Sequence, residues 1–335
     1  MTQSTDTYNV STEKQFEQFC SLLTAMPDIE PLLQTLLMDR HYPYPQRSEF
    51  MLLLKDLPCY VEKISQYPFD DYRFSPSIEA FITALKHCGL PLSHSQFNML
   101  CVAPYYKKFS SCKPYLMDLL STFQSALQSS EVKLKRIAQQ NEAQRNCEEL
   151  AQYIDQIFSQ HSTLLIIRID LSFLKQLDIT LDKLEADLKH FHSNKRYHPL
   201  LKEMLGYITK IEYGIDKKLH IHALFIFNGN DYCKDVSIAQ VIGDYWINTI
   251  TVGHGIYFNC NHNKDKYTKL GIGAIKHDDT EKRNNLIDAI SYLCKKSTQV
   301  IKPHHAPMTK LLRRGQFKVS NSPKLGRHRI ESQFT

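Results

Sequence analysis

Glycine is distributed very unevenly along this chain. Ten of its eleven glycines lie at Gly206 or later, and Gly89 is the only one among the first 205 of its 335 residues. Glycine serves tight turns and close backbone approaches, whereas glycine-poor segments with recurrent apolar residues are typical of helices. The distribution therefore predicts a helical N-terminal half and a turn-rich C-terminal half. The length has room for two domains.

The N-terminal half shows the spacing of amphipathic helices. Phe81, Leu85 and Cys88, for example, recur at intervals of three and four residues, and clusters of Pro, Asp and Ser interrupt the pattern. A more polar stretch from about Leu127 to Gln160 predicts a long helix that leads into the second domain. We expect an all-α domain over residues 1–155, in which nothing carries recognisable chemistry.

The pattern changes to strands after residue 161. Residues 163–171 form a continuous β-prone run, and two further β-rich segments are joined by a short turn at residues 214–218, as in an antiparallel hairpin. The expected strands cover 163–171, 207–213, 219–227 and 255–260, and the expected helices cover 181–205, 236–249 and 281–297. This order predicts an α+β fold with an antiparallel, split βαβ sheet, one face of which is free of helices. A site is expected on that free face.

Positive charge is concentrated at the C-terminal end. The whole chain carries +6, but residues 261–335 hold sixteen Lys and Arg against six Asp and Glu. Such polarisation suits a polyanion partner, because neutralising phosphates supplies most non-specific affinity for nucleic acid. We interpret residues 306–335 as a basic C-terminal tail. The alternative is a solvated tail without a partner.

Several classes of protein are excluded by what the sequence lacks. No stretch approaches the roughly 20 apolar residues of a membrane helix, and the first residues do not resemble a signal peptide. We therefore expect a cytoplasmic protein with no membrane partner. The nine cysteines form no CxxC pair, and there is no GxxxxGK[ST] motif, which argues against a zinc ribbon and a fused helicase.

A pair of histidines offers metal-binding chemistry. His220 and His222 stand two apart in an expected strand, so both imidazoles point to the same side of the sheet. The hairpin brings Glu212 alongside, and two His with one Glu leave coordination positions open for catalysis. The mixed nitrogen and oxygen ligands favour Mg²⁺ or Mn²⁺. Alternatively, the histidines are satisfied by hydrogen bonds and Glu212 is a surface carboxylate.

Tyr292 is the candidate nucleophile. It lies in an expected helix with Lys295 and Lys296 three and four residues later, so all three share one helix face. A phenol with a pKa of about 10 is a poor nucleophile at neutral pH unless nearby positive charge stabilises the negative charge of the phenolate. The alternative is that Tyr292 packs its helix against the sheet while the lysines are solvated.

The combination of these elements resembles a known family. Residues 168–173 (RIDLSF), 211–229 (IEYGIDKKLHIHALFIFNG) and 289–303 (AISYLCKKSTQVIKP) carry the resemblance. They are similar to the HUH endonucleases of rolling-circle replication, in particular to the inovirus gene II replication protein family and its prophage relatives of the YagK/YfjJ type. The resemblance covers roughly residues 160–305 and not the N-terminal half, and it implies a ferredoxin-like HUH palm, which we expect to form a domain over residues 156–305.

The resemblance also implies roles for individual residues. His220 and His222 match the metal-binding HUH pair, and Tyr292 with Lys295 matches the single-tyrosine YxxK motif. Glu212 matches the third ligand only by its position on the preceding strand, and Asp170 is left open as an alternative. The residues expected to bind DNA are Arg168, Lys296, Lys302, Arg313, Arg314 and Lys318.

The implied function is initiation of rolling-circle replication. Tyr292 would attack a phosphate of a single-stranded DNA origin, giving a 5′-phosphotyrosine and a free 3′-OH, and the reverse reaction would rejoin the strand without ATP. A host helicase and a polymerase are the further partners that this role implies. One rival hypothesis is a phage- or prophage-derived DNA-binding regulator without catalysis. Another is an interaction module that works through the helical half.

Overall fold

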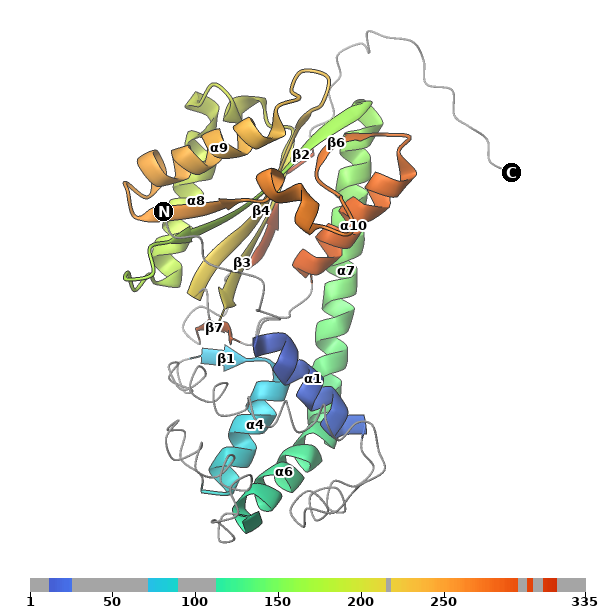
Figure 1. Cartoon of the computed structure of the whole chain (residues 1–335), viewed down its shortest axis with the longest axis vertical. Helices are drawn as coiled ribbons and strands as arrows, with labels where there is room; N and C mark the ends of the chain where they lie inside the picture. Colours follow the sequence, from blue (N-terminus) through green and yellow to red (C-terminus); the bar gives the residue numbers. More distant parts are fainter. Residues whose placement is uncertain are drawn as a thin grey trace, which may run out of the picture.

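The structure, a computed structural model of the chain, describes residues 12–25, 72–89, 113–214, 218–294, 300–303 and 310–317. Two parts follow one another in these residues: a helical N-terminal part and a sheet flanked by helices (Figure 1). The α+β class predicted from the sequence is confirmed. No helix of the described residues is long and apolar enough to cross a membrane.

The helical part is built around α1 (Thr12–Ala25), α4 (Pro76–His87) and α6 (Lys113–Gln128). Aromatic side chains from all three helices meet in its core, with the ring of Phe81 5.6 Å from that of Phe16 and 5.0 Å from that of Phe123. Helix α4 begins where Ser75 caps it, since the Ser75 hydroxyl accepts a hydrogen bond from the Ile78 amide. This half is helical because its apolar residues recur at helical spacing.

Helix α7 (Ser130–Gln160) connects the two parts. Its 31 residues span about 46 Å, and it runs alongside both parts in Figure 1. Near its start, Val132 packs into the core of the helical part, whereas Tyr153 and Ile157 near its end pack beneath the sheet. The predicted boundary between residues 155 and 156 therefore lies inside a continuous helix.

The central sheet consists of β2 (Thr163–Phe173), β3 (Gly206–Gly214), β4 (Lys218–Asn228) and β5 (Gly255–Asn259). Its strands lie in the order β3-β4-β2-β5, and all neighbours are antiparallel. Helix α8 (Leu181–Asn194) follows β2, and α9 (Asp235–Tyr245) with the π-helical turn η4 (Trp246–Ile250) follows β4. This is the split βαβ topology predicted from the element order, and it is the ferredoxin-like arrangement of strands that the resemblance implied.

Short strands extend the sheet beyond this core. β1 (Tyr72–Phe74) pairs with β7 (Val300–Pro303), β7 and β8 (Leu312–Arg314) pair with β3, and β6 (Gly273–Lys276) pairs with β2. The remaining elements are η2 (Lys195–Tyr197), η3 (Leu201–Glu203), η5 (Cys260–Lys266) and α10 (Thr280–Cys294).

Several expectations from the sequence need correction. The N-terminal half is not all-α, because β1 joins the sheet, and part of the predicted basic tail is strand β8. The helix expected over 181–205 ends at Asn194 and continues as η2 and η3, and β6 was not expected. Strands of three or four residues are too short to show periodicity, and only pairing with distant partners stabilises them.

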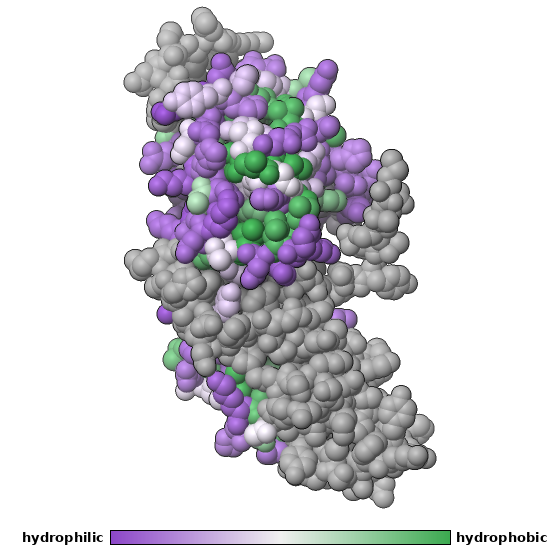
Figure 2. Space-filling view, turned by 90° about the vertical axis from the view of Figure 1, so that its left-hand side faces the viewer, coloured by the Kyte–Doolittle hydropathy of each residue, from purple (hydrophilic) through white to green (hydrophobic). Residues whose placement is uncertain are grey.

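Helices pack on both faces of the sheet, so the prediction of a helix-free face is wrong. α8 and α9 cover one face, which we call the α8 face, and Phe191 and Ile242 are buried there against Ile167 and Phe225. α7 and α10 pack against the other, the α7 face, where Ile157 and Ile290 join a second core with strand residues such as Ile166 and Ile226. The side of the molecule that carries α8 and α9 is drawn in Figure 2, where hydrophilic residues cover most of the described surface and apolar residues show between them.

The composition of the strands follows this coverage. In β2, residues 164–167 are all apolar and buried, because helices cover both faces there. From Arg168 onward the strand alternates, and β3 and β4 alternate likewise around Lys210 and His222. A group of polar residues from these strands points to the α7 face and forms what we call its polar half: Arg168, Asp170, Ser172, Lys210, Glu212, His220 and His222.

Candidate metal centre

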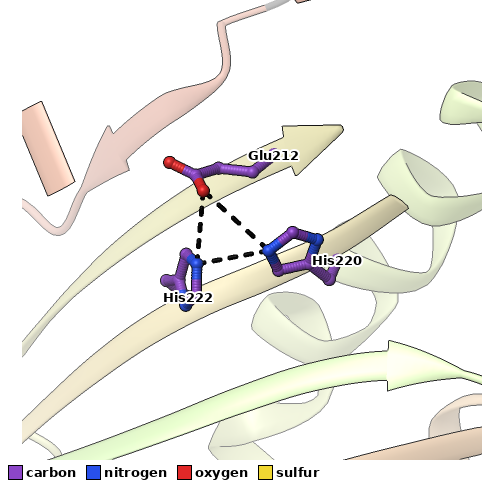
Figure 3. A group of neighbouring side chains, drawn as sticks. All are labelled: Glu212, His220 and His222. Carbon is purple, nitrogen blue, oxygen red and sulfur yellow. Dashed lines mark hydrogen bonds and ion pairs between the residues drawn. The ribbon is translucent and has the colours of Figure 1, made fainter. Parts of the chain in front are cut away.

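Three ligand atoms converge in the polar half of the α7 face (Figure 3). His220 and His222 lie two apart on β4, and Glu212 stands directly opposite His220 on β3. The two Nε2 atoms are 3.2 Å apart, and Glu212 Oε2 lies 3.3 Å from His222 Nε2 and 3.9 Å from His220 Nε2. All three side chains are buried. The hairpin thus places the carboxylate beside the histidines, as predicted.

Each imidazole is oriented by a partner on its far side. Asp170 Oδ1 lies 2.6 Å from His222 Nδ1, and the Lys218 carbonyl oxygen lies 2.9 Å from His220 Nδ1. A carbonyl only accepts hydrogen bonds, so His220 Nδ1 must carry the proton. Both rings therefore turn Nε2 toward Glu212. Asp170 does not join the three ligand atoms, and its role is to orient His222 from outside, as partners of metal-binding histidines do.

The charges of the group are strongly coupled. Burial lowers the pKa of His222, but the hydrogen bonds and charges of Asp170 and Glu212 outweigh burial and raise this pKa to about 9. Burial and the charge of His222 together lower the pKa of His220. Burial raises the pKa of Glu212, but its hydrogen bond and ion pair with His222 outweigh burial, so the net shift is downward. His222 is therefore protonated on both ring nitrogens at neutral pH, with Nδ1 facing Asp170 and Nε2 facing Glu212.

The residues present fit a divalent cation. Glu212 Oε1 is buried and has no hydrogen-bond partner among the described residues, and such an atom is costly unless something binds it. The three ligand atoms lie within 4.8 Å of one another. Ligands about 2.1 Å from a shared ion lie roughly 3.0 to 3.4 Å apart. Two of the three separations, 3.2 and 3.3 Å, fall in this range, and the third, between Glu212 and His220, is 3.9 Å. Two imidazoles and a carboxylate could thus hold a metal ion with little rearrangement.

Tyr292 lies beside this group although it comes from a different element. Its ring centre is 6.4 Å from that of His222, and 43% of the residue is exposed. Helix α10 carries it there because Leu286, Ile290 and Leu293 are buried against α7 and the sheet. The sequence predicted Tyr292 and the histidines separately, and the tertiary structure brings them together.

Arg168 lies between two tyrosines. Its guanidinium carbon is 5.9 Å from the ring centre of Tyr292 and 5.8 Å from that of Tyr267. The Arg168 Nε atom is buried and lacks a hydrogen-bond partner among the described residues. Arg168 follows the same strand as Asp170, two residues earlier, so it points to the same face. The structure therefore places a positive charge next to Tyr292.

The other residues predicted to bind DNA are not gathered at this site. Arg313 pairs with Glu185 of α8, whereas Arg314 lies 5.1 Å from the ring centre of Tyr153 of α7. The two arginines thus point to opposite faces of the sheet and are engaged within the fold. Their contact with DNA stays a prediction. Lys295, Lys296 and Lys318 lie outside the described residues, as does the side chain of Lys302, whose backbone belongs to β7.

Two residues near the centre, Lys210 and Tyr267, were not predicted from the sequence. Lys210 is 4% exposed and stands opposite His222 on β3, on the same face. The alternation of Lys210 and Glu212 along β3 was a signal that both point to the side of the histidines. Tyr267 lies after η5, where no local pattern indicates its proximity to Arg168.

A ferredoxin-like sheet that carries a buried group of two histidines and one glutamate defines the class: an α+β protein with a candidate metal centre. Residues 127–306 match the family model of the YagK/YfjJ C-terminal domain. This match covers more than half of the chain, and the chain belongs to that family. Neither the curated proteins nor the solved structures that were searched include a match.

Proposed function

We propose that this chain nicks and rejoins single-stranded DNA, with Tyr292 as the nucleophile, in the manner of an HUH-type rolling-circle replication initiator. The observation that supports this proposal most strongly is the position of Tyr292. An exposed tyrosine of α10 has its ring centre 6.4 Å from that of His222 in the group of possible metal ligands. Tyrosine oxygen is a nucleophile suited to covalent catalysis on phosphate. Membership of the YagK/YfjJ family, which is of prophage type, agrees with a role in mobile DNA.

The proposed metal ion is Mg²⁺ or Mn²⁺, held by His220, His222 and Glu212. When bound, such an ion withdraws charge from a phosphoryl oxygen. Asp170 fixes the orientation of His222 through the bond to Nδ1. Arg168, beside the Tyr292 ring, stabilises the negative charge that develops as the tyrosine oxygen gives up its proton and approaches phosphate.

The reaction is a transesterification. The Tyr292 oxygen forms a bond to the phosphorus of the scissile phosphate, and the bond from phosphorus to the 3′-oxygen breaks. The proton lost by tyrosine is balanced by the proton that the 3′-oxygen gains. A 5′-phosphotyrosine and a free 3′-OH result, and attack of a 3′-OH on the phosphotyrosine rejoins the strand. The free 3′-OH is a primer for a polymerase, so a host polymerase and a helicase are the partners proposed.

A covalent adduct is the direct test. The full chain is incubated with Mn²⁺ and a pool of random single-stranded oligonucleotides, and adducts that survive denaturing gel electrophoresis are sequenced. We expect an adduct with the wild type and none with Tyr292→Phe or with excess chelator. Tyr197→Phe is the matched control, because Tyr197 is also exposed but follows α8 on the opposite face.

Two results would contradict the proposal: no adduct with the wild type, or as much adduct with Tyr292→Phe as with the wild type. Equal DNA binding by both proteins without an adduct would favour the rival function, a DNA-binding regulator without catalysis.

A further inference from the structure

Strand β5 presents two large apolar side chains next to the candidate metal centre. Phe258 is 43% exposed and Ile256 is 37% exposed. They stand two apart on the strand, so both point to the same face. Phe258 pairs with Asp170 in register, and Asp170 holds His222. The exposed phenyl ring therefore lies on the α7 face, beside its polar half.

The distance from this ring to the centre follows from the strand register. Lys210, His222, Asp170 and Phe258 stand directly opposite one another in β3, β4, β2 and β5. Neighbouring strands lie about 4.8 Å apart, so two spacings place Phe258 about 10 Å from His222 along the row. This separation suits a nucleotide next to the one whose phosphate would lie at the centre.

A positive charge accompanies the ring. Lys266 of η5 has its ammonium nitrogen 5.8 Å from the ring centre of Phe258. Arg168 lies on the same face and adds a second cation. An exposed aromatic face beside an ammonium group is complementary to an unpaired nucleotide, which offers a flat base and a phosphate. In a duplex the base faces are already stacked and could not reach the ring.

We propose that Phe258 is a stacking platform for one nucleobase of the single-stranded DNA substrate, next to the scissile phosphate, with Lys266 at an adjoining phosphate. This inference rests on the proposed function, which is the reason to expect a DNA strand on this surface. It does not depend on catalysis, because stacking and ion pairing contribute to binding even when no bond is cut. The occupant is a base of any type, since every base offers a π-face.

Binding without cleavage tests the platform. The affinity of the full chain for a short fluorescent single-stranded oligonucleotide is measured by anisotropy in excess chelator. We expect Phe258→Ala to weaken binding about tenfold and Phe258→Trp to retain it. Tyr197→Ala is the matched control, because Tyr197 is exposed and lies beside Arg196, 4.6 Å from its ring centre, yet follows α8 on the opposite face. This control should leave the affinity unchanged.

A scan with single abasic positions locates the stacked base. At one position, removal of the base should weaken wild-type binding about as much as Phe258→Ala does, and the two changes together should cost no more than either alone. Additive losses at every position, or wild-type affinity in Phe258→Ala, would overturn the platform. Wild-type affinity in Phe258→Ala would instead leave β5 as a surface for a protein partner.

The outcome is separable from the test of nicking. If the wild type forms no adduct but Phe258→Ala still loses binding at one base, the platform stands and the proposed catalysis fails. If the adduct forms and Phe258→Ala binds normally, the catalysis stands and the platform fails.

Two controls separate stacking from a loss of stability. A thermal melt of Phe258→Ala shows whether the exposed site tolerates the change. Phe258→Leu keeps apolar bulk without the aromatic face and should lose affinity as well.

Discussion

His222 is held between two carboxylates, and this arrangement decides how the centre responds to pH. Asp170 binds Nδ1 and Glu212 faces Nε2, and together they raise the pKa of His222 to about 9. Without metal, the His222 imidazole is therefore protonated on both nitrogens and positively charged at neutral pH. A metal ion needs a bare nitrogen, so it must displace that proton. His220 has a lowered pKa and is neutral in the same range.

We therefore predict that Mn²⁺ binding at pH 7 releases about one proton and that affinity rises roughly tenfold for each pH unit between pH 7 and 8. The dependence should level off above the His222 pKa of about 9. Titration calorimetry in two buffers with different ionisation enthalpies measures the released proton. Asp170→Asn removes one charge that raises this pKa and should reduce the release. Equal heats in both buffers for the wild type would contradict the prediction.

At the scale of elements, the position of α10 decides whether Tyr292 reaches the centre. The chain passes very close to this helix at Gly271, where a Cβ would lie 2.4 Å from the backbone of Asn285. Such a contact cannot be relieved by turning a side chain. Glycine at this position thus permits the approach of the segment before β6 to α10.

Gly271→Ala should therefore shift α10 or the segment that contacts it. We expect a loss of about 1 to 3 kcal/mol in the free energy of unfolding, measured by chemical denaturation. Adduct formation should fall further than the folded fraction accounts for, because Tyr292 moves with α10. Thr268→Ala, an exposed change in the same segment, is the control. Wild-type stability in Gly271→Ala would show that the contact between this segment and α10 can accommodate a Cβ atom.

At the scale of the whole molecule, charge is divided between the two faces of the sheet. Arg168 points to the α7 face, beside Tyr292 and the candidate centre, whereas Arg313 points to the α8 face and pairs with Glu185. A DNA strand bound along the α7 face would contact Arg168 but not Arg313. The positive balance of residues 261–335 therefore does not by itself say which residues touch DNA.

The salt dependence of DNA binding separates the two arginines. We expect Arg168→Ala to reduce the slope of log affinity against log salt concentration by about one, since one phosphate contact is lost. Arg313→Ala should leave the slope unchanged. It should lower stability by at most about 1 kcal/mol, as is usual for a partly exposed ion pair. If both variants reduce this slope equally, the DNA strand must contact both faces of the sheet or pass around its edge.

The sequence by itself determined the local parts of this protein. The two-residue period of a strand puts His220 and His222 on one side, and a short hairpin turn brings Glu212 beside them. The order of strands and helices was also predictable, because each long element shows its own periodicity. Even the polar half of the α7 face was present in the sequence, where β2 changes from a continuous apolar run to alternation at Arg168.

Only the tertiary structure decided which of these parts meet. Tyr292 reaches His222 because α10 docks on the α7 face, and Phe258 stands beside Asp170 because β5 pairs with β2. The same holds for β1 and β8, which join the sheet through partners far away in sequence. Such contacts depend on the total burial that the fold achieves, and no segment of ten residues carries that information. The ligands of the candidate centre could thus be predicted, whereas the surface around it could not.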